Sequence, residues 1–229
     1  MSVYARPSFV LGNSWQLNYL SLDDRAALDC EPFVLVCNCF PEHWRKIGFR
    51  PTIWAFGDTN NSECCQILAD QLEAIRSDQD LRQRLRHLFV CCESAEAERI
   101  VARCELPIIR YRRGSWARRE QRLATSLSEP IYHYGSTLTD LVNLAQLLNP
   151  GQEVRICGGQ HGRILGHFYN RGDEIHAVSA MPREFERMWK GFGDLVRAGH
   201  PLVDCNFEHD VKLPRDGRLP RKALFEGMS

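Results

Sequence analysis

The sequence predicts a single α/β domain in which a mostly parallel sheet is covered by helices on both faces. Short apolar runs alternate with longer segments in which apolar residues recur three or four positions apart. This alternation is typical of a Rossmann-like, doubly wound sheet. The chain has 229 residues, a length at which one domain with one sizeable core is common.

The short apolar runs are expected to be buried strands, because continuous apolar runs of this length are typical of strands covered on both faces. They lie at 9–11, 33–36, 52–56, 88–92, 108–109, 154–157 and 202–203. The segments of helical period between them predict helices over 62–86, 95–104, 138–148 and 183–198.

The helix over 138–148 has the clearest signals at both ends. Thr137 and Asp140 have the spacing of a capping box, and Asn149-Pro150-Gly151 ends the helix. One apolar stripe runs along it, formed by Leu138, Leu141, Val142, Ala145 and Leu148. We expect the N-terminus of this helix to face the carboxyl ends of the strands.

Two further segments lack a clear period. Residues 109–127 carry six arginines and are predicted to be a mobile loop with a short helix, and residues 207–229 are predicted to be a C-terminal extension, extended or wrapped over a domain that spans 1–206. The arginines are Arg110, Arg112, Arg113, Arg118, Arg119 and Arg122.

Composition excludes several classes of protein. Lys plus Arg equals Asp plus Glu at 29 each, so no strong positive field favours nucleic acid as a partner. The sequence shows neither a run of about 20 apolar residues nor a signal peptide, which predicts a cytoplasmic protein without a transmembrane segment. Most of the ten cysteines lie in apolar runs and none forms C-x-x-C, which predicts reduced thiols and no metal site.

Polar or glycine-rich residues follow the predicted strands at several points. Gly12-Asn13-Ser14 ends the first strand, Asn38 the second and Asp58 the third. Glycine lets backbone N–H groups approach a ligand, and Asn or Asp side chains can bind a base edge, a ribose hydroxyl or, for Asp, Mg²⁺. Each of these residues can equally serve only its own turn or cap.

Two later segments carry stronger signals. Gly135-Ser136-Thr137 places two hydroxyls at a helix N-terminus, where free N–H groups and the helix dipole favour an anion. Gly158-Gly159-Gln160-His161 follows a strand, and so much glycine requires a reason such as the close approach of a ligand.

Taken in order, these segments resemble the bacterial CMP-sialic-acid-dependent sialyltransferases of glycosyltransferase family forty-two and their wider relatives with a Gly-x-Gly-Pro-Ser-Leu opening. Gly12-Asn13-Ser14-Trp15-Gln16-Leu17 stands at the opening, Asn38 after the second strand and Gly135-Ser136 at the helix start. The likeness covers about residues 8–206. Ser14-Trp15 replaces Pro-Ser, and Gln160 stands where the family has an acidic residue.

The resemblance implies a glycosyltransferase A-type variant of the fold and an inverting, metal-independent enzyme. Such an enzyme would transfer sialic acid or a related sugar from a CMP-sugar donor to a glycan acceptor, with no other cofactor. It implies a cytidine nucleotide held by Asn13 and Asn38, a phosphate contacted by Ser136 and Thr137, and a ribose near Asp58. Residues 109–127 correspond to the acceptor-covering lid of the family.

The family also has a histidine base and a tyrosine that bonds the leaving phosphate. His176 is favoured as the base, with His161 and His167 nearer the glycine run, and Tyr169 is the counterpart of the tyrosine. An imidazole suits this role because its ordinary pKa lies near the operating pH. The arginines of 109–127, among them Arg112, Arg113, Arg118 and Arg119, are candidates to pair with a sugar carboxylate.

Two other functions remain open at this stage. One is a Mg²⁺-dependent pterin pyrophosphokinase-like enzyme, for which Asp58 offers a carboxylate but Gln160 removes the second metal ligand. The other is a nonenzymatic nucleotide- or glycan-binding protein of the same fold. The sequence is compatible with a homo-oligomer and does not fix the oligomeric state.

Overall fold

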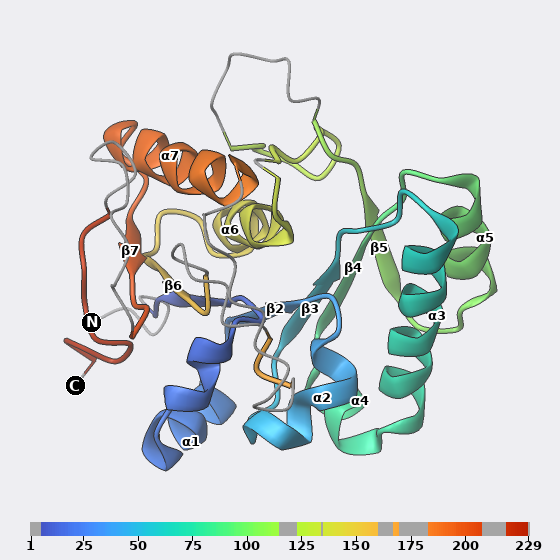
Figure 1. The fold of residues 1–229 in the computed structure, drawn as a ribbon, viewed down its shortest axis with the longest axis horizontal. Coiled ribbons are helices and arrows are strands. Elements are labelled where there is room, and N and C mark those ends of the chain that lie inside the picture. Colours follow the sequence, from blue (N-terminus) through green and yellow to red (C-terminus); the bar gives the residue numbers. More distant parts are fainter. Residues whose placement is uncertain are drawn as a thin grey trace.

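The computed structural model describes residues 6–114, 123–133, 135–159, 167–169, 183–207 and 219–228. These residues form one α/β domain around a seven-stranded sheet with the order β5-β4-β3-β2-β1-β6-β7 (Figure 1). Every strand pair is parallel, which confirms the predicted fold class. The strands are β1 (Ser8–Leu11), β2 (Val34–Cys37), β3 (Ile53–Phe56), β4 (His87–Cys91), β5 (Ile108–Tyr111), β6 (Val154–Cys157) and β7 (Leu202–Asp204).

Helices cover both faces of the sheet (Figure 1). Successive strand residues point to opposite faces, so Phe9 and Leu11 pack in one core, whereas Val10 packs in the other. The first core is closed by η1 (Trp15–Tyr19), α1 (Leu22–Cys30), α2 (Phe40–Ile47), α3 (Ser62–Ser77), α4 (Gln79–Arg84) and α5 (Ala95–Arg103). The second is closed by α6 (Thr137–Leu148) and α7 (Arg183–Arg197).

Three predictions about secondary structure were incomplete or wrong. The predicted helix over 62–86 is broken at Asp78, which is extended and whose carboxylate accepts a hydrogen bond from the Leu81 N–H to cap α4. The sequence analysis missed α1 and α2, although Ser21 and Asp24 form a capping box at α1 and Gly48, with φ of 87°, ends α2. The predicted loop over 109–127 begins inside β5, which extends to Tyr111.

The chain reverses its direction across the sheet between β1 and β6. From β1 the strands proceed outward to β5, and α6 then returns the chain to β6 on the other side of β1. In open α/β sheets, the crevice outside the carboxyl ends of the strands at such a point is the usual ligand site.

The loops after β1 and β6 touch through their backbones. The Gly12 N–H donates to the Cys157 carbonyl at 2.8 Å and the Ser14 N–H to the Gly158 carbonyl at 3.2 Å. A Cβ on Gly12 would lie 2.4 Å from the Gly158 oxygen, and a Cβ on Gly158 would lie 2.4 Å from the Gly12 oxygen. The sequence analysis attributes the glycines in these loops to the close approach of a ligand. At Gly12 and Gly158, however, the close neighbour is the other loop.

Residues 219–228 lie against the sheet. Leu219 and Leu224 are buried, and the Arg155 guanidinium donates to the carbonyls of Leu224 and Glu226 at 2.5 and 2.8 Å. All ten cysteines are free thiols. Of the helices in the described ranges, none combines the length and the apolar character needed to cross a membrane.

The contact between the two loops can be tested by comparing Gly158→Ala with Gly151→Ala. Both glycines have positive φ, 72° and 74°, but a Cβ on Gly151 would meet nothing within 4 Å. We expect Gly151→Ala to cost about 1 kcal/mol for the left-handed backbone, and Gly158→Ala about 3 kcal/mol or more because the loops must also separate. Urea unfolding of both variants measures the difference, and equal losses would contradict the role given to the loop contact.

Candidate functional site

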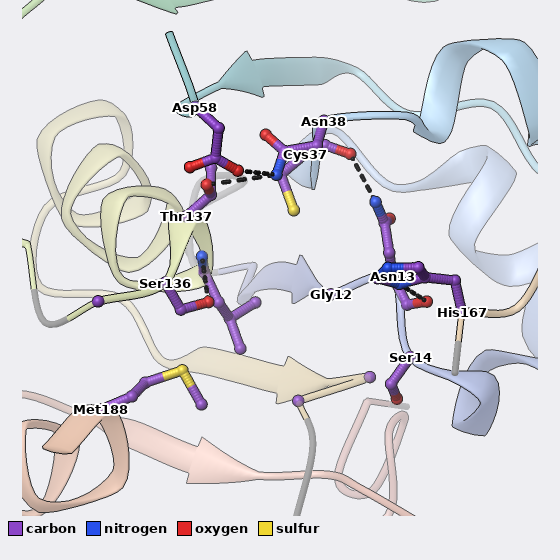
Figure 2. Close-up of a pocket in the computed structure, with 14 residues that line it drawn as sticks. Gly12, Asn13, Ser14, Cys37, Asn38, Asp58, Ser136, Thr137, His167 and Met188 are labelled. Carbon is purple, nitrogen blue, oxygen red and sulfur yellow. Dashed lines mark hydrogen bonds between the residues drawn. The ribbon is translucent and has the colours of Figure 1, made fainter. Parts of the chain in front are cut away.

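The predicted strand-end residues meet in one pocket of about 240 Å³ at the carboxyl edge of the sheet (Figure 2). It lies where β1, β2, β3 and β6 end and α6 begins. The predicted residues that line it are Gly12, Asn13, Ser14, Asn38, Asp58, Gly135, Ser136, Thr137, Gly158 and Gly159. Cys37, Leu138, His167 and Met188 also line it. The sequence analysis named His167 only as a histidine near the glycine run and did not predict the other three.

Of the remaining predicted residues, the structure describes Tyr169. Gln160, His161 and His176 lie outside the described residues. Tyr169 does not line the pocket: its ring stacks on His43 at 4.1 Å and on His167 at 4.9 Å between centroids. Burial raises the pKa of the Tyr169 hydroxyl, with the nearby Cys39 thiol a smaller cause, so the hydroxyl expected at a leaving phosphate stays protonated and lies outside the pocket lining.

The opening loop contributes two buried polar atoms that no described residue pairs. The Asn13 side-chain N–H donates to the Cys37 carbonyl at 3.0 Å, which fixes the amide. Its Oδ1 and the Ser14 hydroxyl oxygen are buried and have no hydrogen-bond partner among the described residues. A buried polar group left unpaired costs about 1–3 kcal/mol. Two such atoms in one pocket indicate a place for a polar ligand.

Asn38 closes the carboxyl end of β2 in a left-handed conformation, with φ of 46°, which asparagine tolerates better than most residues. Its Oδ1 accepts the Gly57 N–H at 3.2 Å, which identifies the oxygen of the amide. Its Nδ2 donates to the Asp58 carboxylate at 2.8 Å and to the Thr137 hydroxyl at 3.4 Å (Figure 2). Asn38 therefore ties β2 to β3 and to the start of α6.

The start of α6 differs from the prediction. Ser136 is the N-cap and its hydroxyl accepts the Leu138 N–H at 3.3 Å, so the predicted capping box of Thr137 and Asp140 is wrong. Thr137 instead faces Asn38, and Asp140 turns away from the helix end. The pocket still receives the N-terminal end of a 12-residue helix, where free N–H groups and the dipole favour an anion.

Asp140 is the centre of a buried network that the sequence analysis missed. It is fully buried and its carboxylate accepts from the Tyr111 hydroxyl at 2.7 Å and from Arg113 Nε at 2.8 Å. His133 Nδ1 lies 2.8 Å from its other oxygen. An aspartate in the first turn of a strongly apolar helix was the available signal, but it was attributed to capping.

Arg113 is part of this network and does not lie on a solvated loop. Its side chain is 9% exposed. Burial alone would lower the pKa of Arg113, but the Asp140 and Asp58 carboxylates raise the pKa above its ordinary range. The guanidinium is therefore a fixed cation below the pocket wall, and this corrects the expectation that Arg113 belongs to an acceptor-covering lid. Arg118, Arg119 and Arg122 lie outside the described residues.

His167 is the histidine that the described structure brings to the pocket. Its Nδ1 lies 3.2 Å from the Asn13 carbonyl oxygen, which can only accept, so Nδ1 carries the hydrogen and Nε2 keeps its lone pair. Partial desolvation of the ring lowers the pKa of His167 below its ordinary value, although the residue is exposed at the surface. The imidazole is therefore neutral near pH 7, in the tautomer that can accept a proton at Nε2.

The sulfur and carboxylate groups of the site do not form a cluster of metal ligands. Burial raises the pKa of the Cys37 thiol, so it stays protonated. Asp58 is the pocket-lining carboxylate among the described residues, and the same residues contain no group of three or more His, Cys, Asp or Glu that could hold a metal ion.

Comparison with known proteins shows the fold. No family model matches the chain, and no curated protein sequence matches it. The solved structure of the MAf glycosyltransferase from Magnetospirillum magneticum AMB-1 is similar, with a TM-score of 0.54 and 13% sequence identity. The match covers 96% of this chain and 35% of that chain, so this chain spans about a third of the length of the glycosyltransferase. The expected membership of the sialyltransferase family itself is not shown.

The lowered pKa of His167 predicts a dependence of stability on pH. Because its pKa is lowered on folding, the unfolded chain binds a proton more readily, and stability is lost as the pH falls below about 6.5. The pKa of His43 is also lowered by burial, so His167→Gln should reduce the loss without abolishing it. Free energies of unfolding at pH 7.5, 6.5 and 5.5 measure this, and an unchanged pH slope in His167→Gln would contradict a lowered pKa of His167 in the folded chain.

Proposed function

We propose that this chain is an inverting glycosyltransferase that needs no metal. It would transfer sialic acid or a related sugar from a CMP-sugar donor to a glycan acceptor. The observation that carries the proposal is the convergence of four strand ends and the α6 N-terminus on one pocket, with Asn13 Oδ1 and the Ser14 hydroxyl buried there without a partner among the described residues. The fold likeness to a glycosyltransferase supports it.

The pocket offers a separate environment to each part of a nucleotide. Asp58 has a half-exposed carboxylate, which suits the hydroxyls of a ribose because they are donors. The α6 N-terminus with Ser136 and Thr137 suits the phosphate. Asn13 Oδ1 has no partner among the described residues and can accept from the amino group of a cytosine base, whereas both N–H groups of Asn38 are already used inside the protein. Base recognition is therefore assigned to Asn13, and Asn38 holds the wall.

The reaction needs two services from the protein. The acceptor hydroxyl attacks the anomeric carbon and loses its proton to a base, while the bond to CMP breaks and its electrons leave with the phosphate. We propose His167 as the base, because it lines the pocket and presents an unprotonated Nε2. The resemblance favoured His176, with His161 as the alternative. The helix N-terminus stabilises the phosphate that departs.

The first prediction of this proposal concerns ligand selectivity. CMP without metal should raise the melting temperature, because a ligand at about 100 times its Kd adds about 2.7 kcal/mol to the stability of the folded state. UDP, ADP and ATP should have smaller effects at equal concentration, with or without Mg²⁺. A thermal-shift series measures this. A requirement for ATP with Mg²⁺ would contradict the transferase and support the pterin pyrophosphokinase-like alternative.

The second prediction concerns catalysis and separates an enzyme from a binding protein. His167→Ala should lower turnover of a CMP-sugar donor about 10²–10⁴-fold, the usual contribution of a general base, and should leave CMP affinity within about threefold of the wild type. Donor turnover of the wild type, His161→Ala, His167→Ala and His176→Ala, measured beside their CMP affinities, makes the assignment. A selective loss in His176→Ala would return the role to the residue favoured by the resemblance. CMP binding without turnover of the donor would show a nonenzymatic protein.

A further inference from the structure

The guanidinium of Arg113 passes close to Gly57, in the loop after β3, and contacts Thr137 at the pocket wall. A Cβ on Gly57 would lie 2.0 Å from Arg113 Nη2 and 2.6 Å from the Thr137 hydroxyl oxygen. Because Gly57 has no side chain, the Arg113 guanidinium can occupy this space and contact Thr137. Arg113 itself is not among the residues that line the pocket.

Three acceptors hold this guanidinium in one orientation. Nε donates to the buried Asp140 at 2.8 Å, Nη2 donates to the Thr137 hydroxyl oxygen at 3.0 Å, and Nη1 lies 3.4 Å from Asp58. Tyr111 donates to the same Asp140 oxygen and restricts it further. A buried ion pair is weak evidence for stability, since desolvation offsets its attraction. A planar fork with fixed donors is nevertheless well suited to setting geometry.

The contacts of Thr137 decide what its hydroxyl can do. Its oxygen accepts from Arg113 and from Asn38 Nδ2, and a hydroxyl oxygen has two lone pairs. Both acceptor sites are therefore filled. The O–H hydrogen remains to be donated, and no hydrogen bond from it to another described residue is present. Thr137 is 4% exposed and lines the pocket at the α6 N-terminus.

We propose that Arg113 is a positioning residue that makes the Thr137 hydroxyl an obligate hydrogen-bond donor to an anionic group bound at the α6 N-terminus. The inference rests on the proposed function, in which that group is the phosphate of a cytidine nucleotide. Arg113 acts through Thr137 and does not touch the ligand. With a lysine at this position, the ammonium can pair with Asp140, but it lacks the planar fork that reaches Asp140 and Thr137 together.

A double-mutant cycle tests this route. CMP affinity is measured by calorimetry for the wild type, Arg113→Lys, Thr137→Val and the double variant. Arg113→Lys should weaken CMP about tenfold in the wild-type background, because a charge-assisted contact that orders the donor is lost. In the Thr137→Val background the same change should cost less than about twofold, since the hydroxyl through which Arg113 acts is absent. Thr137→Ser keeps the hydroxyl and should keep the full sensitivity to Arg113→Lys.

Two controls separate positioning from a general effect on folding. Arg50→Lys alters another Arg–Asp pair, in which Arg50 donates to Asp29 at 2.6 and 3.0 Å, outside the pocket, and should leave CMP affinity unchanged. Cytidine lacks the phosphate, so Arg113→Lys should weaken cytidine far less than CMP. If Arg113→Lys does not fold, Tyr111→Phe removes one donor to Asp140 and replaces it in the cycle, with an expected loss of about threefold.

The outcomes are distinguishable. Equal losses of CMP affinity in the two Thr137 backgrounds, or equal losses for CMP and cytidine, would overturn the inference and leave the proposed function in place. Failure of the wild type to bind CMP would overturn both. Coupled losses specific to the phosphate support both.

Discussion

The backbone contact between the loops after β1 and β6 is the constraint on which the pocket depends. Parallel pairing brings Leu11 opposite Cys157, and the chains then continue side by side through Gly12 and Gly158, each in the space that a Cβ of the other would need. Because this contact holds the first loop, the side chains of Asn13 and Ser14 are carried to the switch point of the sheet. Gly12 and Gly158 therefore allow the two loops to pack together, and this packing forms the pocket wall without a ligand.

A second constraint acts from the opposite side of the pocket. Asp140 on α6 is hydrogen bonded to Tyr111 on β5 and to Arg113, two residues after the end of that strand. The start of α6 is therefore tied to an edge strand as well as to the central strands that it covers. Removing two charges from water is costly, and a purely apolar contact would attach the helix as well. The charged network additionally fixes the orientation of the Arg113 guanidinium, which donates to Thr137 at the pocket wall.

The sequence predicted the seven strands and most residues of the pocket, because these follow from local patterns, but it missed α1 and α2. Apolar runs mark the strands, and polar residues that directly follow parallel strands must gather at one edge of the sheet. The Arg113–Asp140 pair was not predictable in this way, since its residues are 27 positions apart and each has a plausible local explanation, as a loop arginine and a helix cap. His167 was named only as a histidine near the glycine run and was not chosen, because nothing in its neighbours along the chain indicates that its ring meets the Asn13 carbonyl.

The polar groups of the pocket divide into those that the protein uses and those that it leaves open, and this division orients a ligand. Asn38 spends both N–H groups on Asp58 and Thr137, and the lone pairs of Thr137 are filled by Arg113 and Asn38. Among the residues that the structure describes, the groups that remain open are an acceptor at Asn13, a hydroxyl at Ser14, a half-exposed carboxylate at Asp58 and donors at the start of α6. The carboxylate repels an anion, whereas the helix start attracts one. Under the proposed function, a nucleotide would lie with its phosphate toward α6 and its sugar hydroxyls toward Asp58, because the opposite orientation would place like charges together.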